Sequence, residues 1–110
     1  MSMRRFLVLA GCAALCFCQV ALAAGKGDAA KGKAAYRSQC AACHNADSRQ
    51  KKIGPGLKGL FQWDKTTNGK NPTEANIRGK IDEGGNGMPA FNDVLSGQEK
   101  DDLVAYLKTL

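Results

Sequence analysis

One short stretch decides the fold of this 110-residue chain: Cys40-Ala41-Ala42-Cys43-His44. Two thiols three positions apart, with an imidazole directly after the second, form the attachment pattern of a covalently bound haem. Each cysteine sulfur can add across one of two neighbouring vinyl groups at the porphyrin edge, and the two intervening residues let one turn of chain reach both. The imidazole then lies over the ring face, where a ring nitrogen can bind the iron. The pentapeptide therefore predicts one haem c, with thioethers to Cys40 and Cys43 and His44 as the proximal iron ligand.

Two other chemistries also use a Cys-x-x-Cys pair. A redox dithiol would be expected in a thioredoxin-like βαβ setting, and a zinc site would need two more ligands. The chain has no cysteine after Cys43, and His44 is its only histidine. These absences favour haem over zinc, and a thiol oxidoreductase acting through Cys40 and Cys43 stays open as an alternative.

The N-terminus has the features of an export signal. Arg4 and Arg5 precede an almost entirely apolar run over residues 6–22, which ends in the small residues that a signal peptidase reads. We therefore expect cleavage after Ala23, with residues 1–23 forming a secretory signal peptide. Residues 24–110 would then be a single monohaem domain in the periplasm.

A second interpretation of the N-terminus is a lipoprotein signal. Residues 9–12 resemble a lipoprotein box, in which Cys12 would be acylated and become the new N-terminal residue. Only six residues separate Arg5 from Cys12, which is short for the apolar region of a signal. A lipid-anchored form through Cys12 is therefore the minor alternative to a freely exported protein.

Cleavage after Ala23 changes the composition of the protein. It leaves 87 residues, enough for one small domain, and removes every cysteine except Cys40 and Cys43 and every methionine except Met88. The net charge falls from +6 to +4, with 14 basic and 10 acidic residues. The basic residues are dispersed, which argues against nucleic-acid binding and favours electrostatic steering towards an acidic protein partner.

Three stretches have the pattern of helices, and the first precedes the haem motif. Asp28 can cap a helix from Ala29 to about Gln39, in which Gly32 and Tyr36 lie on one face. Because glycine costs about 1 kcal/mol relative to alanine in a helix interior, Gly32 suggests that a second helix passes very close.

The other two stretches lie in the C-terminal half. In Asn71-Pro72-Thr73-Glu74, we expect Asn71 to cap a helix whose first residue is Pro72 and which ends at Gly84-Gly85. Ser96 and Glu99 have the spacing of a capping box. The helix that they open has an apolar stripe with Leu103, Val104 and Leu107, and an expected wet side with Asp101, Asp102 and Lys108. With no sustained period-two alternation, the chain is predicted to be all-α, with three principal helices.

Together these features resemble the class I c-type cytochromes, small electron carriers of mitochondria and bacteria. The resemblance spans nearly all of residues 26–110 in family order. Residues 27–36 and 40–44 look like the N-terminal helix and haem motif, 54–57 like the proximal loop, 87–91 like the distal ligand loop and 102–108 like the C-terminal helix. It implies the cytochrome c fold, in which three helices and their loops wrap around one covalently attached haem.

The resemblance also implies roles for individual residues. Gly32 and Tyr36 would cross against Leu103 and Tyr106. The carbonyl of Pro55 would accept a hydrogen bond from His44 Nδ1 and hold the imidazole in place. Trp63 would contact a haem propionate through its ring nitrogen, the alternative being a half-buried indole whose N–H reaches solvent or backbone.

Met88 decides the functional class. A lone methionine is most often a filler of core gaps, but this one follows the flexible segment 84–87 and precedes Pro89. We expect it to be the distal iron ligand, because His/Met ligation raises the reduction potential and leaves no open position on the iron.

The function predicted from a closed iron is electron transfer without catalysis. The protein would be a one-electron carrier of a periplasmic respiratory or dehydrogenase-linked chain, not an enzyme, with no small-molecule substrate. Its partners would be a redox donor and acceptor, such as a dehydrogenase, cytochrome complex or terminal oxidase, docked on a monomer at the haem edge. The alternative is a haem enzyme or gas-binding module with an open sixth position.

Overall fold

The computed structural model describes residues 27–110. The expected signal peptide over residues 1–23 and the alternative lipidation site Cys12 lie outside these residues. Three α-helices follow one another along the described chain, with a short 3-10 helix between the first two: α1 (Ala29–Gln39), η1 (Leu60–Gln62), α2 (Glu74–Glu83) and α3 (Gly97–Leu107). No strand forms within residues 27–110, where the one isolated bridge joins Gly85 to Met88. The predicted all-α fold with three principal helices is confirmed.

The caps expected for α1 and α3 are present. The Asp28 carboxylate accepts the N–H of Ala30 at 2.8 Å, as an N-cap does. In α3, Ser96 Oγ accepts the N–H of Glu99 at 3.1 Å, and the Glu99 carboxylate accepts the N–H of Ser96 at 2.9 Å. These reciprocal bonds form the capping box that the sequence predicts.

The start of α2 differs from the prediction. Its N-cap is Thr73, whose Oγ1 accepts the N–H of Asn76 at 3.1 Å, so the helix begins at Glu74 rather than at Pro72. Asn71 does not act as the cap because its side-chain oxygen accepts Lys65 Nζ at 2.6 Å. The end is as predicted, with Gly84 as the C-cap at φ 63°.

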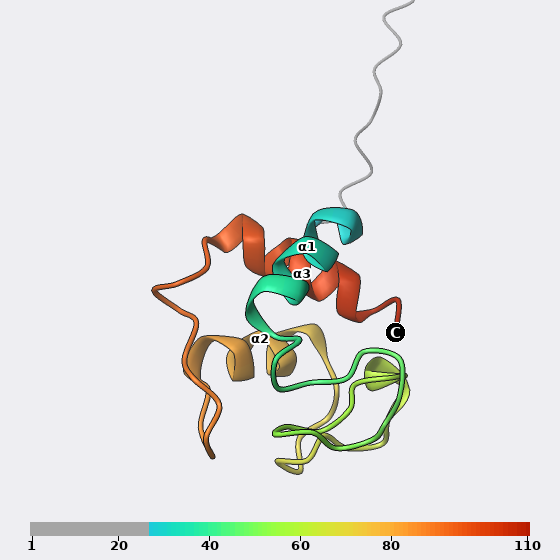
Figure 1. Cartoon of the computed structure of the whole chain (residues 1–110). Coiled ribbons are helices and arrows are strands. Elements are labelled where there is room, and N and C mark those ends of the chain that lie inside the picture. The colour runs from blue at the N-terminus through green and yellow to red at the C-terminus, as the bar shows by residue number, and fades with distance from the viewer. Residues whose placement is uncertain (1–26) are drawn as a thin grey trace, which may run out of the picture.

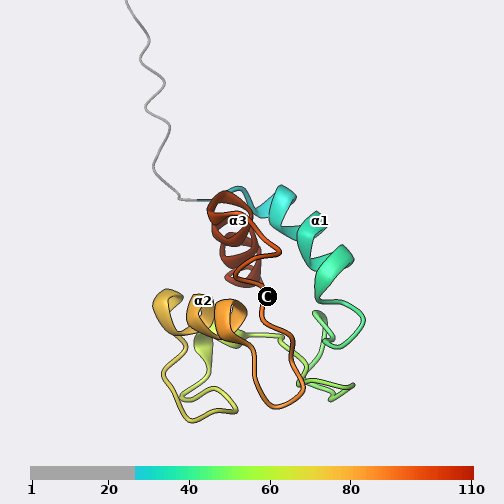
Figure 2. The same cartoon turned by 90° about the vertical axis from the view of Figure 1, so that its left-hand side faces the viewer.

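Helix α3 contacts both other helices and crosses α1 at Gly32. Figures 1 and 2 show α1 and α3 against each other, with α2 beneath them. A Cβ at Gly32 would collide with the carbonyl oxygen of Asp102 and lie 2.8 Å from Tyr106 Cβ. The Tyr36 and Tyr106 rings meet one turn further along, with centroids 5.3 Å apart. The close approach inferred from Gly32 is therefore real, and the small residue is a steric requirement.

The position of Asp102 corrects the sequence interpretation. It was expected on the wet side of α3, but it is only 4% exposed. Its carboxylate accepts the N–H of Asp28 at 2.8 Å and Gln98 Nε2 at 2.9 Å. A short carboxylate that receives two hydrogen bonds can be buried at the helix crossing, and it ties the start of α1 to α3.

These bonds make Asp102 a source of pH dependence. The Asp28 N–H, followed by the Gln98 amide, lowers the pKa of the Asp102 carboxyl below its usual range. Because the folded-state pKa is depressed, the stabilisation is complete above the unfolded value of about 3.9 and is lost as the pH falls through the folded value. We expect Asp102→Asn to be less stable than wild type at neutral pH and to lose less stability on acidification. Urea unfolding of both proteins from pH 6 downwards tests this, and parallel profiles would contradict it.

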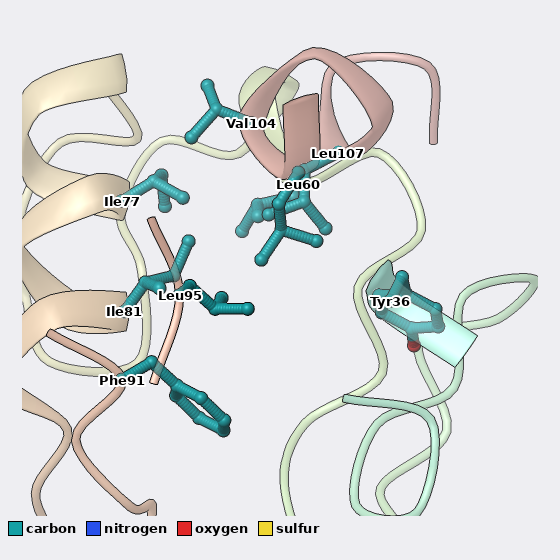
Figure 3. Close-up of a cluster of buried hydrophobic side chains, with 9 residues drawn as sticks. Tyr36, Leu60, Ile77, Ile81, Phe91, Leu95, Val104 and Leu107 are labelled. Atoms are coloured by element: carbon teal, nitrogen blue, oxygen red, sulfur yellow. The ribbon is translucent and has the colours of Figure 1, made fainter. Parts of the chain in front are cut away.

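The core is a single cluster of buried apolar side chains from all three helices and the loops between them. Its members are Tyr36, Leu60, Ile77, Ile81, Phe91, Leu95, Leu103, Val104 and Leu107. In Figure 3, Ile77 and Ile81 of α2 lie on one side of the view and Tyr36 of α1 on the other. Six of these nine side chains also line one cavity, so the core is spread around a space rather than packed into one layer. Within residues 27–110, no helix is long and apolar enough to cross a membrane.

Candidate functional site

The Cys-Ala-Ala-Cys-His segment forms a tight turn at the end of α1. Cys40 is the C-cap of that helix, and its carbonyl oxygen accepts the N–H groups of Cys43 at 3.1 Å and His44 at 3.0 Å. Both thiols are free and half-buried. The turn therefore gathers two thiols and an imidazole within one short piece of chain.

The His44 ring is held by the loop that follows. Its Nδ1 lies 2.8 Å from the carbonyl oxygen of Pro55, the contact that the resemblance implied. A carbonyl oxygen only accepts, so Nδ1 carries the proton and the Nε2 lone pair is left for a metal. Gly54 packs directly on the ring, since a Cβ there would lie 2.5 Å from Cε1. Its N–H also donates to the Cys43 carbonyl at 2.7 Å.

A largely apolar cavity opens in front of this imidazole. The space between its walls is about 980 Å³, including the part continuous with solvent. Its walls include Cys40, His44, Leu60, Ile77, Ile81, Met88, Leu103 and Leu107. A second, smaller cavity shares Cys40, His44 and Met88 with the first and adds Cys43. The two predicted thioether cysteines and the two predicted iron ligands therefore line two cavities that share Cys40, His44 and Met88.

Met88 reaches the cavity from a sharply turned loop. Four consecutive residues, Gly84, Gly85, Asn86 and Gly87, have positive φ angles of 63°, 110°, 54° and 88°. The turn is closed by two hydrogen bonds between Gly85 and Met88, at 2.9 and 3.1 Å. Three glycines allow this backbone at little steric cost, and asparagine is among the residues that tolerate it best. The loop thus presents a half-buried thioether to both cavities.

The set of donors matches what a c-type haem requires. Two thiols are available for thioethers, an imidazole has a free Nε2, and a soft thioether lines the same cavity. Six leucine and isoleucine side chains among the remaining wall residues suit a large apolar plane, and threonine, asparagine and lysine side chains also line the cavity. The residues present therefore fit the cofactor.

Comparison with known proteins agrees with this chemistry. Residues 27–107 match the family described as "Cytochrome C oxidase, cbb3-type, subunit III". The chain belongs to the cytochrome c family. The class I c-type cytochrome predicted from the sequence is confirmed, and with it the cofactor, since members of this family hold one covalently attached haem c.

Similar individual proteins within the family are cytochromes c6. The chain is 40% identical to cytochrome c6 of Synechocystis sp. over 80 residues, which are 73% of this chain and 63% of that protein. It is 35% identical to cytochrome c6 of Leptolyngbya boryana over 80 residues, which are 73% of this chain and 89% of that protein. The structure of cytochrome c6 from the diatom Phaeodactylum tricornutum superimposes with a TM-score of 0.62 at 33% identity, over 76% of this chain and 93% of that one.

The two chemical alternatives to haem attachment have little support in the site of this cytochrome. Burial, followed by the charge of Cys43, raises the pKa of the Cys40 thiol to about 11. A redox dithiol needs a thiolate near neutral pH, and Cys40 would be protonated there. Within residues 27–110, no group of three or more His, Cys, Asp or Glu side chains could hold a metal ion, which tells against zinc.

Trp63 lines the main cavity, but its ring nitrogen has a protein partner. Nε1 donates to the carbonyl of Lys58 at 3.0 Å, which is the backbone contact considered as the alternative for this indole. The guanidinium of Arg49 lies 4.2 Å from the ring centroid, in a cation–π contact. A propionate contact by Trp63 stays a prediction.

Tyr36 has a role at the site that the sequence analysis missed. Its hydroxyl donates to the carbonyl of His44 at 2.6 Å, and the ring is almost fully buried. Burial is the largest cause that raises the pKa of Tyr36 to about 12, so the hydroxyl stays a donor at any physiological pH. The contact ties the backbone of the proximal ligand to α1. A tyrosine eight residues before a histidine gives no sequence signal of such a bond.

Proposed function

We propose that this cytochrome is a one-electron carrier of a periplasmic respiratory or dehydrogenase-linked chain, with His44 and Met88 as the two axial ligands of its iron. The observation that supports it best is that these two side chains line the same cavities as Cys40, while Nδ1 of the imidazole is bound by Pro55. Export through cleavage after Ala23 belongs to the proposal.

Each residue of the site has a distinct task in this function. Cys40 and Cys43 tether the cofactor through thioethers, and Pro55 and Gly54 fix the plane of the His44 ring. Haem, when bound, supplies reversible one-electron oxidation and reduction. Met88 would supply a soft sulfur ligand to the iron, which favours the ferrous state and would leave no open position for oxygen or other small molecules.

An electron carrier has no small-molecule substrate, so its partners are the redox proteins that give it an electron and take one from it. A carrier must leave its donor and acceptor quickly, and redox complexes have small, weak interfaces. The net charge of +4 left after removal of the leader favours an acidic surface on each partner. We propose that a redox donor and acceptor dock in turn at the haem edge of a monomer.

The optical spectrum of the purified haem protein tests the proposal. A weak long-wavelength sulfur-to-iron band in the ferric form, with no carbon monoxide shift in the ferrous form, is expected from a closed His44/Met88 site. If the band is absent and carbon monoxide binds readily, the iron has an open position, and the protein is a haem enzyme or gas-binding module rather than an electron carrier.

Replacing Met88 by alanine should convert the closed site into an open one. We expect the sulfur-to-iron band to disappear, carbon monoxide to bind, and the reduction potential to fall by an appreciable part of the ~0.8 V range that axial ligands control. Val94→Ala is the matched control, because Val94 is 56% exposed and lines neither cavity. A Met88→Ala protein that kept the wild-type band and potential would show that another residue is the ligand.

A second candidate rests on the name of the matching family. That family is described as a subunit of a cbb3-type cytochrome c oxidase, and its match covers 27–107. The chain would then be a fixed electron-transfer subunit of a larger complex rather than a diffusing carrier. Cell fractionation separates the two, since a carrier is released with the periplasm and a subunit purifies with membrane-bound oxidase.

A further inference from the structure

Three ion pairs join α2 to α3, and one of them differs from the others. The pairs are Glu74–Lys108, Arg78–Asp101 and Asp82–Lys100, so their α2 members recur every four residues along one stripe. The Lys100 side chain is only 8% exposed, whereas those of Lys108 and Arg78 are 46% and 33% exposed. Lys100 is therefore the buried member of an otherwise ordinary set.

Lys100 also lies where a lysine is least expected. It is the fourth residue of α3, near the positive end of the helix dipole, where a cation is unfavourable. Burial adds a desolvation cost that only close partners can offset. Because Lys100 is both buried and placed at the unfavourable end of the helix, the partners of its ammonium group must offset these two costs.

The ammonium group holds two segments at once. Nζ lies 2.7 Å from Asp82 Oδ1 on α2 and donates to Asn92 Oδ1 at 3.1 Å. Asn92 belongs to the segment 84–95, which follows α2 and contains Met88 four residues earlier. The Phe91 N–H donates to the Ile81 carbonyl at 2.9 Å, so this end of the segment is fixed to α2 as well.

The other end of the segment is held in the same manner. Lys80 Nζ donates to the carbonyl of Gly84 at 3.0 Å and to that of Gly85 at 3.3 Å. Lys80 and Lys100 therefore bind the segment on either side of the Met88 turn. Of these two lysines, Lys100 is the one that belongs to α3, whereas Lys80 belongs to α2.

We propose that Lys100 is a positioning residue for Met88, acting through Asn92, and that it keeps the thioether loop closed over the cavity. This inference rests on the proposed His44/Met88 ligation. If Lys100 is lost, the loop leaves the cavity for a larger fraction of the time, and an external ligand gains access in proportion to that open fraction.

The test compares three variants of the haem protein. Lys100→Met keeps the apolar stem and removes the ammonium, while Asn92→Ala removes the loop partner and leaves the Lys100–Asp82 pair in place. Arg78→Met is the matched control, because Arg78 joins the same two helices through Asp101, and its hydrogen bonds go to Asp101 and Gly97, both outside segment 84–95. Imidazole binding to the ferric form is the probe, and urea unfolding gives the stability of each variant.

We expect Lys100→Met and Asn92→Ala to bind imidazole about tenfold more tightly than wild type. Their sulfur-to-iron band should weaken, and the amide hydrogens of Gly85 and Met88 should exchange faster. Arg78→Met should leave the imidazole affinity, the sulfur-to-iron band and the amide exchange unchanged. This should hold even if its urea midpoint falls as far as that of Lys100→Met. The proposal would be overturned if Asn92→Ala bound imidazole as weakly as wild type and exchanged the amide hydrogens of Gly85 and Met88 as slowly. This outcome can be read even if Lys100→Met does not fold.

A failure of the proposed function looks different. Wild type would then lack the sulfur-to-iron band and bind carbon monoxide. Amide exchange of Gly85 and Met88 would still measure whether Lys100 orders the loop, because it does not depend on a bond to iron.

Discussion

A protein in which Cys40 and Cys43 are both replaced by alanine is expected to have no cooperative fold. Six of the nine buried apolar side chains also line the main cavity, among them Leu60, Ile77 and Ile81, so much of the core borders a space instead of filling it. Without the tethered haem, the cavity must either fill with water or close by collapse of its apolar walls. A domain of this size has few other contacts with which to compensate.

Far-ultraviolet circular dichroism and thermal melting measure this loss. We expect a weak helical signal and no sigmoidal transition for the double variant. The unmodified chain made in a host that cannot attach haem is the control, and it should behave alike, which separates the loss of the cofactor from the loss of two thiols. A native helical spectrum with cooperative melting in the double variant would contradict the coupling of folding to haem attachment.

Gly32→Ala should be strongly destabilising, because among the glycines of residues 27–110 Gly32 approaches another segment most closely. The new Cβ would collide with the Asp102 carbonyl oxygen and lie 2.8 Å from Tyr106 Cβ. Backbone cannot yield as a side-chain end does, so α1 must move away from α3. We expect a loss of about 4 kcal/mol or more, which is a large part of the stability of a small domain.

The matched control is Gly79→Ala in the interior of α2. A Cβ at Gly79 would meet nothing within 4 Å, so only the helix propensity changes there. We expect that variant to gain about 0.5–1 kcal/mol. Urea unfolding of the two haem proteins should therefore give shifts of opposite sign, and a neutral Gly32→Ala would mean that the helices do not cross as described.

Sequence patterns predicted the elements of this fold because the signals are local. Asp28 and the Ser96–Glu99 box mark helix starts through side chains that bond to nearby backbone, and both lie where expected. Gly32 predicted a helix crossing because an interior glycine is costly without such a reason. The haem motif is similarly local, with its chemistry contained in five consecutive residues.

What sequence patterns missed depends on contacts between distant segments. Asp102 was assigned to the wet face because aspartate is usually exposed, yet the N–H that it accepts belongs to Asp28 at the other end of the domain. Lys100 precedes Leu103 and Val104 by three and four residues, so its place on the apolar stripe was visible. Its partners on α2 and on the Met88 segment were not, because no local pattern links these positions.

The crossing of α1 and α3 also determines at what stage of its synthesis the protein can fold. The partner of α1 is made last among the described elements, and the Gly59 N–H is bonded to the carbonyl of Leu110. A nascent chain emerging from the ribosome therefore has a first helix with nothing to pack on. The α1–α3 crossing cannot form until synthesis has passed Leu107, so the thiols of Cys40 and Cys43 remain accessible until that point.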